Sequence, residues 1–313
     1  MATEPLVSIC IPTYQRPEFF RQALESVLHQ TYQNLDIFVT DDSADDRTEQ
    51  LIQPYLADGR ITYEHHPEYT SADNWERLRV YDNPEAEYVC WLMDDDLFLP
   101  DKIRSMVEAF REHPDVSLVT SYRPVMDGNG NLLPAERQPP RIIPENMVLD
   151  GQSAGCLALV WVMNYIGEPS TTLMRKSFIE NHRYEWIDIK PAYDFHDVPM
   201  WLNLLQKGNL YYFAKPLSYF RMHGNNEQMD HGKRAGSVIC WAQLIEHAWE
   251  THQFLRSEND LAKSLRRLIG TYLHICQEDW FVDLPEEMRR DYEAVIGTAF
   301  LAISKLPEEE TPT

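Results

Sequence analysis

Residues 87–103 read EYVCWLMDDDLFLPDKI, an apolar run followed by three adjacent aspartates and then by a helix start. The apolar residues 88–93 predict a buried strand, and a helical pattern runs from residue 100 to residue 111. Ligands of an open parallel sheet bind outside the carboxyl ends of its strands, which is where Asp94, Asp95 and Asp96 fall. Adjacent carboxylates repel one another unless a divalent cation neutralises them. The stretch therefore predicts a strand that ends at a ligand site.

Strand and helix patterns alternate on both sides of this stretch. Strands are predicted at residues 6–11, 35–40, 61–64 and 116–121, and helices from Pro17 onward, at 47–56 and at 72–81. Such alternation is typical of a sheet whose strands run mainly parallel and are joined by helices. We therefore predict an α/β fold with a mixed, mainly parallel sheet flanked by helices.

A second acidic strand end helps to choose between two interpretations of the aspartates. Taken alone, residues 94–96 would fit a solvated turn before a helix. The predicted strand at 35–40 also ends in acids, Asp41 and Asp42. Two acidic loops at the same edge of a sheet favour a binding site over a surface turn.

The sequence changes character after residue 122. Residues 123–145 are rich in Pro, Gly and Asn, and DGNG at 127–130 predicts a turn. Beyond them we expect helices at 156–164 and 198–206, strands at 172–174 and 210–213, and helices through most of 235–306. The last residues, 307–313, are expected to form a flexible tail.

Charge and composition exclude several classes of protein. The 313 residues contain 28 Lys and Arg against 50 Asp and Glu, a formal charge of −22, which opposes binding to nucleic acid. The glycine-rich phosphate loops GxGxxG and GxxxxGK[ST] do not occur, so a bound phosphate would need a cation. Five widely spaced cysteines suit reduced thiols. We find no targeting or transmembrane segment and expect a cytoplasmic protein.

Several motifs together resemble those of one enzyme family. The motifs are VSICIPTYQRPEFFRQALESVLHQTYQNLDIFVTDDSADDRT at 7–48, Asn74, the stretch at 87–103, and YFRMHGNN at 219–226. In order and spacing they resemble the nucleotide-diphosphosugar glycosyltransferases of inverting family 2, which have the Rossmann-like GT-A fold. The resemblance implies a GT-A domain at 1–234, with a nucleotide-sugar-binding half at 1–122 and an acceptor-binding half at 123–234. Residues 235–306 would form a helical region outside it.

The resemblance also implies where the nucleotide binds. Pro12, Tyr14 and Arg16 would line its pocket together with Asn74. The carboxylate of Asp42 or Asp41 would accept a hydrogen bond from the base, which suits the ring N–H of uracil or thymine. The alternative for these two acids is that they cap the helix at 47–56.

A metal site is the next implication. Asp94, Asp95 and Asp96 match the DxD element, which holds Mn²⁺ or Mg²⁺ against the donor's diphosphate. We expect Asp95 to be the direct ligand, Asp96 to assist it and Asp94 to face the ribose or sugar, although many members have Asp where Met93 stands. His223 would add a nitrogen ligand, and Arg221 would lie near the phosphates.

The catalytic base is expected in YDFHDVPMW, residues 193–201. Its second acid matches the family's general base, which gives Asp197, while His196 replaces the commoner Glu. Inversion by direct displacement needs one carboxylate that takes the proton of the acceptor hydroxyl. Asp197 could instead be a helix N-cap, and Asp194 is the second candidate for the base.

Together these residues predict a metal-dependent inverting glycosyltransferase that uses a UDP- or dTDP-sugar and a glycan or glycoconjugate acceptor. The alternatives are a nucleotidyltransferase, which would normally show a glycine-rich loop, and an inactive nucleotide-sugar-binding protein. Lys263, Arg266 and Arg267 form a basic amphipathic stretch that could contact the inner face of a membrane. A solvated helix face or a homo-oligomer contact through the C-terminal helices is the preferred explanation.

Overall fold

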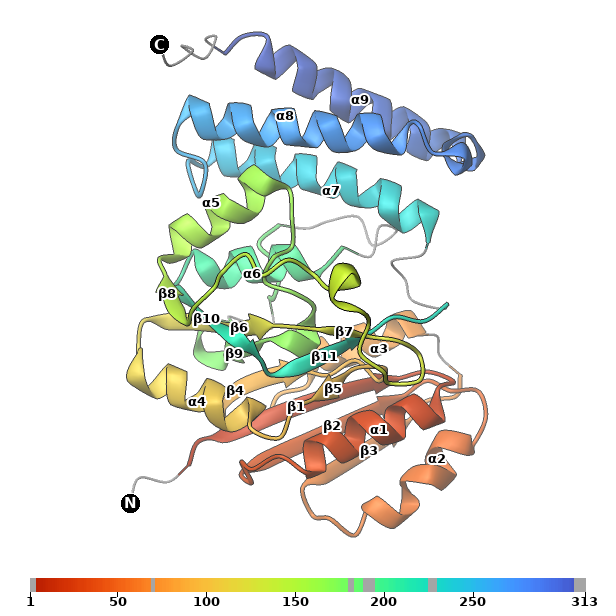
Figure 1. Ribbon diagram of the computed structural model, residues 1–313. Helices are drawn as coiled ribbons and strands as arrows, with labels where there is room; N and C mark the ends of the chain where they lie inside the picture. The colour runs from red at the N-terminus through yellow and green to blue at the C-terminus, as the bar shows by residue number, and fades with distance from the viewer. Residues whose placement is uncertain (1–3, 69–70, 180–182, 188–194, 225–229, 307–313) are drawn as a thin grey trace. The chain divides into compact units, whose positions relative to one another are not determined.

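The computed structural model describes residues 4–68, 71–179, 183–187, 195–224 and 230–306, which form two compact units (Figure 1). The first unit comprises residues 1–149, 166–184 and 207–223, and the second comprises 150–165, 185–206 and 224–313. The units are therefore divided elsewhere than at the predicted boundaries after residues 122 and 234. Residues 150–165 and the described part of 185–206 group with the C-terminal helices. The predicted division into a nucleotide-sugar-binding half, an acceptor-binding half and a helical region stays a prediction.

An eight-stranded sheet forms the centre of the first unit, in the order β3-β2-β1-β4-β9-β6-β10-β8. Its strands are β1 (Leu6–Thr13), β2 (Leu35–Asp41), β3 (Ile61–His65), β4 (Ala86–Trp91), β6 (Val116–Tyr122), β8 (Met147–Leu149), β9 (Leu173–Arg175) and β10 (Asn209–Pro216). The first four strands in the order are parallel to one another, and β6 is parallel to β10. Strand β9 pairs antiparallel with β4 and β6, and β8 pairs antiparallel with β10. The mixed, mainly parallel sheet is confirmed.

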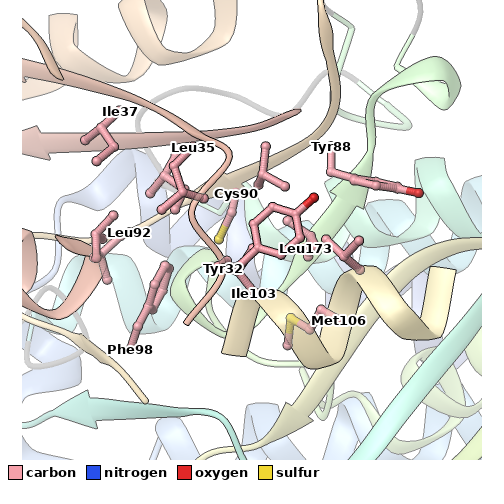
Figure 2. Packing of buried hydrophobic residues seen from close by; sticks show 14 of the residues in the cluster. Tyr32, Leu35, Ile37, Tyr88, Cys90, Leu92, Phe98, Ile103, Met106 and Leu173 are labelled. Atoms are coloured by element: carbon pink, nitrogen blue, oxygen red, sulfur yellow. The ribbon is translucent and has the colours of Figure 1, made fainter. Parts of the chain in front are cut away.

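Helices cover the sheet where the apolar periodicity predicts them. The first unit contains α1 (Pro17–Leu28), α2 (Arg47–Ile52), α3 (Ser71–Val80) and α4 (Lys102–Glu112), with the short 3₁₀ turns η1 (Gln53–Tyr55), η2 (Ala135–Arg137), η3 (Pro169–Thr171) and η4 (Lys176–Phe178). Alternate residues of β1 and β2 pack against α1 and α4 in one buried core. Figure 2 shows part of it, with Ile37 of β2, Cys90 of β4, and Ile103 and Met106 of α4.

The opposite face of β2 packs against the end of α3. Phe38 stacks on Tyr81 directly after the helix, with ring centroids 4.0 Å apart. Because side chains alternate along a strand, Phe38 points away from the core that Ile37 enters. This packing brings the α3 residues Asn74 and Arg77 beside β1 and β2.

A small second sheet in the same unit was not predicted. It has the order β5-β11-β7 and consists of β5 (Leu97–Phe98), β11 (Ser218–Arg221) and β7 (Val125–Met126). Strands of two residues are too short to show a period of two. The predicted DGNG turn is confirmed, since Gly130 N–H donates to the carbonyl of Asp127. The pairing of β11 with β5 joins residues 120 positions apart, which places Arg221 beside the acidic loop.

The second unit is helical and contains α5 (Gly151–Trp161), α6 (Asp197–Leu205), α7 (His231–Glu250), α8 (Glu258–Ile275), α9 (Glu286–Ile303) and the turn η7 (Asp279–Asp283). The last three helices pack on one another, and α5 contacts α6 and α8. The predicted helix at 156–164 starts too late, because Asp150 caps α5 by accepting from Ser153 N–H. None of the helices within the described ranges is long and apolar enough to cross a bilayer.

Gly155 of α5 allows close packing inside this unit. A Cβ at this position would lie 2.2 Å from a ring carbon of Phe254, whose side chain is buried. We expect Gly155→Ala to lower the free energy of unfolding by about 1–3 kcal/mol, since overpacking moves side chains off their rotamers. Thermal unfolding checks this.

Gly270 of α8 is the matched control, because nothing lies within 4 Å of its added Cβ. Gly270→Ala should raise stability by up to about 1 kcal/mol through helix propensity. A melting temperature that rises in both variants would contradict the role assigned to Gly155.

Candidate functional site

The carboxyl ends of β1, β2 and β4 meet at one edge of the first unit's sheet. Thr13 ends β1, and its hydroxyl donates to Asp94 Oδ2 over 2.9 Å. The backbone N–H of Asp42, just past β2, donates to the Thr13 carbonyl over 3.2 Å. Thr13, Asp42 and Asp94 are all buried. The two acidic loops therefore converge, as expected for neighbouring parallel strands.

The turn between β1 and α1 aims Arg16 at this edge. Gln15 has a φ of 54°, in the left-handed region, and its N–H donates to Ser43 Oγ over 2.7 Å. Pro17 then begins α1. Tyr14 lies on the same turn with its side chain exposed, whereas Pro12 is the penultimate residue of β1. A strained turn anchored to the β2 loop is typical of a functional site.

Arg16 bridges two of the three aspartates. Its Nη2 lies 2.7 Å from Asp94 Oδ1, and its Nη1 lies 3.1 Å from Asp95 Oδ2. Asp94 is 1% exposed and Asp95 is 8% exposed, whereas about a third of the Arg16 side chain, 34%, is exposed. The guanidinium is therefore on the more open side of the two carboxylates.

Burial raises the pKa of two of the three aspartates, Asp94 and Asp96. It raises the pKa of Asp94 to about 7, an effect that Arg16 opposes and the charge of Asp95 strengthens. Burial, with the same neighbouring charge, raises the pKa of Asp96 well above its usual value. A bound cation would favour the ionised carboxylates, because its positive charge offsets both the cost of burial and the repulsion between them.

Asp95 and His223 offer an oxygen and a nitrogen donor at one point. His223 Nε2 lies 3.0 Å from Asp95 Oδ2, and its ring packs on Phe19 with centroids 5.0 Å apart. No group of three or more His, Cys, Asp or Glu side chains suited to a metal occurs in the part of the chain that the structure describes. The pair fits Mn²⁺ or Mg²⁺ that takes its other ligands from phosphate and water, as Mg²⁺ commonly does.

Asp96 and Arg221 are engaged inside the protein. Asp96 Oδ1 accepts from the backbone N–H of Arg221 over 2.9 Å. The buried Arg221 donates from Nε to the Asp95 carbonyl over 2.7 Å and from Nη2 to Gln22 Oε1 over 2.8 Å. Its Nη1 donates to the Gly128 carbonyl over 3.2 Å. These contacts favour positioning roles over the predicted contacts of Asp96 with a metal and of Arg221 with phosphate.

The β2 side of the edge contains an ion pair that sequence reasoning missed. Arg77 of α3 pairs with Asp42, and its Nε donates to Thr40 Oγ1 over 2.9 Å. Asn74, one turn earlier, donates from Nδ2 to the Thr13 carbonyl over 2.9 Å. The spacing of Asn74 and Arg77, i and i+3 on one helix face, was the available signal.

Asp41 holds the β2 turn itself. Its carboxylate accepts from the Tyr63 hydroxyl and from the Ser43 N–H, each over 2.8 Å. Neither predicted alternative, a contact with the base or a helix cap, matches these bonds. Of the two acids, Asp42 is therefore the one that we retain for base recognition.

The turn η3 supports the acidic loop from a distant part of the chain. Ser170 Oγ accepts from Met93 N–H over 3.0 Å. Lys102 is fully buried, and its Nζ donates to the Thr171 carbonyl over 2.8 Å. Burial lowers the pKa of Lys102 to about 8. No local pattern in the sequence marks these two residues.

Asp197 belongs to the second unit, where it is the first residue of α6. The helix cap position is occupied by His196, so Asp197 is not the N-cap. His196 Nδ1 lies 3.5 Å from Oε1 of the buried Glu185. Asp194 lies outside the described residues. The catalytic role of Asp197 stays a prediction.

A separate cavity of about 640 Å³ lies near the amino ends of β1 and β4. Ser8, Tyr81 and Arg175 are among its lining residues, and none of the predicted site residues is. Ser8 precedes Thr13 by five residues, which is roughly 16 Å along a strand. The cavity is therefore distinct from the acidic edge.

Comparisons with known proteins point to one family. The sequence model described as glycosyl transferase family 2 matches residues 8–163, about half of the chain. An uncharacterized glycosyltransferase of Rickettsia typhi is 27% identical over 228 residues, which cover 70% of this chain and 64% of that protein. Another from Rickettsia prowazekii is 26% identical over 282 residues, covering 84% and 80%. The chain thus spans just under two thirds of the first relative.

A solved structure supports the fold. Residues 1–349 of Staphylococcus aureus TarS, crystallised with UDP-GlcNAc, superpose with a TM-score of 0.66 at 12% identity. The superposition covers 95% of this chain and 81% of that one. The aligned residues include parts of both compact units, and at this identity the likeness concerns the fold alone.

Proposed function

Because the chain belongs to glycosyltransferase family 2, we propose that it is a metal-dependent inverting glycosyltransferase acting on a nucleotide-diphosphate sugar. The observation that carries the proposal is the convergence of Arg16, Asp94, Asp95 and His223 at the carboxyl edge of the sheet. A diphosphate at this edge would be held by cationic groups, because the glycine-rich phosphate loops are absent from the sequence.

The base of the donor would bind at the β2 side of the edge. Arg77 pairs with Asp42 and orients its carboxylate, which can then accept a hydrogen bond from an N–H of the base. Uracil and thymine present such an N–H, and we propose a UDP- or dTDP-sugar as the donor. Pro12, Tyr14 and Asn74 would complete this pocket.

Asp95 and His223 would hold Mn²⁺ or Mg²⁺, while Asp94 faces the ribose or sugar. When bound, the cation stabilises negative charge on the departing nucleoside diphosphate. Arg221 would keep Asp95 in place by donating to its backbone carbonyl, and Asp96 would fix Arg221 by accepting from its backbone N–H. This assignment replaces the predicted direct roles of both residues.

We assign the proton transfer to Asp197, with Asp194 as the alternative. Its carboxylate takes the proton of an acceptor hydroxyl as that oxygen bonds to the anomeric carbon and the bond to the diphosphate breaks. Attack from the side opposite the leaving group inverts the anomeric configuration. The acceptor is a glycan or glycoconjugate hydroxyl, and contact with a membrane or with a second copy of the chain stays a prediction.

The proposal is tested by incubating the protein with a panel of nucleotide sugars and Mn²⁺ and measuring nucleoside diphosphate release. We expect release from at least one UDP- or dTDP-sugar, and its loss when EDTA removes the cation, because the leaving charge is then uncompensated. Restored activity on adding Mn²⁺ back is the control. Binding of UDP without turnover of any donor would favour the inactive binding protein, and pyrophosphate exchange would favour a nucleotidyltransferase.

A further inference from the structure

The guanidinium of Arg16 and the proposed cation require the same carboxylate oxygen. We infer that Arg16 competes with the divalent cation for the carboxylate of Asp95, and that the cation, when it binds, releases Arg16 to contact the donor's diphosphate. The inference rests on the proposed function, since it assumes the cation site at Asp95 and His223.

The competition is for one atom. Asp95 Oδ2 lies 3.1 Å from Arg16 Nη1 and 3.0 Å from His223 Nε2. A cation held by that oxygen and that nitrogen would therefore be next to a guanidinium, and like charges so close repel strongly where water is limited. Asp94 and Asp95 are nearly buried, so screening by solvent is weak. One of the two positive groups is expected to leave.

Arg16 is the group that can leave. Its backbone is anchored, because Gln15 N–H donates to Ser43 Oγ and the Arg16 carbonyl accepts from Phe20 N–H. The side chain beyond it is long, unbranched and one-third exposed, so a change of rotamer moves the guanidinium without moving α1. By contrast, Thr13 holds the carboxylate of Asp94, and Arg221 holds the backbone carbonyl of Asp95.

The diphosphate is a suitable new partner for the released guanidinium. The planar fork of arginine binds phosphate oxygens through two parallel hydrogen bonds. Arg16 would then oppose the cation in the nucleotide-free protein and support the donor in the complex. The prediction is that one substitution changes the two affinities in opposite directions.

The test measures binding without turnover, by calorimetry or by the electron paramagnetic resonance of free Mn²⁺. In the absence of nucleotide, Arg16→Gln should bind Mn²⁺ roughly three- to tenfold more tightly than the wild-type protein. With Mn²⁺ saturating, the same variant should bind UDP roughly tenfold more weakly. Arg16→Lys keeps the charge but loses the fork, and its Mn²⁺ affinity should lie between the two.

Arg21→Gln is the matched control, because it removes the same charge from α1, close to Arg16 in the sequence. Arg21 pairs with Glu18 and Glu25 on an exposed face of α1. Both affinities should stay within about twofold of wild type. Thermal unfolding of each variant verifies that it is folded.

Unchanged or weaker Mn²⁺ binding in Arg16→Gln would overturn the inference, as would equal tightening in Arg21→Gln, which would reflect net charge alone. If the wild-type protein binds no Mn²⁺ with or without UDP, the proposed cation site fails and the inference fails with it. That outcome is distinguishable, since it is seen before any variant is compared.

Discussion

Asp197→Asn should lower kcat by about 10³-fold, while the affinity for UDP and Mn²⁺ stays within about twofold of wild type. An amide cannot accept the proton of the acceptor hydroxyl, so the loss falls on the chemical step. The substitution keeps the size of a half-buried side chain at the start of α6. Removing one acid from the first turn of a helix costs only about 0.3–1 kcal/mol.

Initial rates of nucleoside diphosphate release at saturating donor and acceptor measure this effect, and calorimetry measures UDP binding. His196→Gln is a useful companion, because it changes the neighbouring residue and leaves the carboxylate in place. A loss of less than tenfold in Asp197→Asn would remove it as the base. Asp194→Asn would then be the variant to examine, since Asp194 is the other acid of the segment.

Asp95→Asn is expected to weaken UDP binding in the presence of Mn²⁺ by at least about 100-fold. The change removes the carboxylate that shares one point with His223, and loss of supporting groups around metal sites alone costs 10–100-fold. Without metal, the variant and the wild-type protein should bind UDP alike. Calorimetric titrations with Mn²⁺ and with EDTA separate the two cases.

Asp101→Asn is the control for Asp95→Asn, because Asp101 is an exposed acid just before α4 and contacts Thr31. Its affinity for UDP with Mn²⁺ should equal that of wild type. Undiminished affinity in Asp95→Asn would show that the cation is bound elsewhere or is not required.

The order of strands and helices in the first unit could be predicted because it depends on local patterns. Residues 88–93 are a continuous apolar run, and residues 6–11 are apolar except for Ser8. Helix α1 has Pro17 at its start and buried residues at helical spacing. Errors occurred where the pattern is short or mixed. The two-residue strands β5 and β7 have no detectable period, and the small residues at the start of α5 hid its first turn.

The candidate site was predictable only in part. The convergence of Asp42 and Asp94 follows from the rule that parallel strands end at one edge, and the structure has this arrangement. The contacts of Arg77, Ser170 and Lys102 do not follow from any such rule. They come from helix and turn positions whose neighbours depend on how distant segments pack.

By itself, the sequence determined the α/β class, the acidic edge and the family, because these depend on periodicity, strand ends and motif order along the chain. Only the tertiary structure decided which contacts each of the three adjacent aspartates makes. Pairing of β11 with β5 places the Arg221 N–H on Asp96 and its guanidinium on the Asp95 carbonyl. Three identical neighbours in the sequence thus differ in their contacts, because residues 79 to 128 positions away hydrogen-bond to them in different ways.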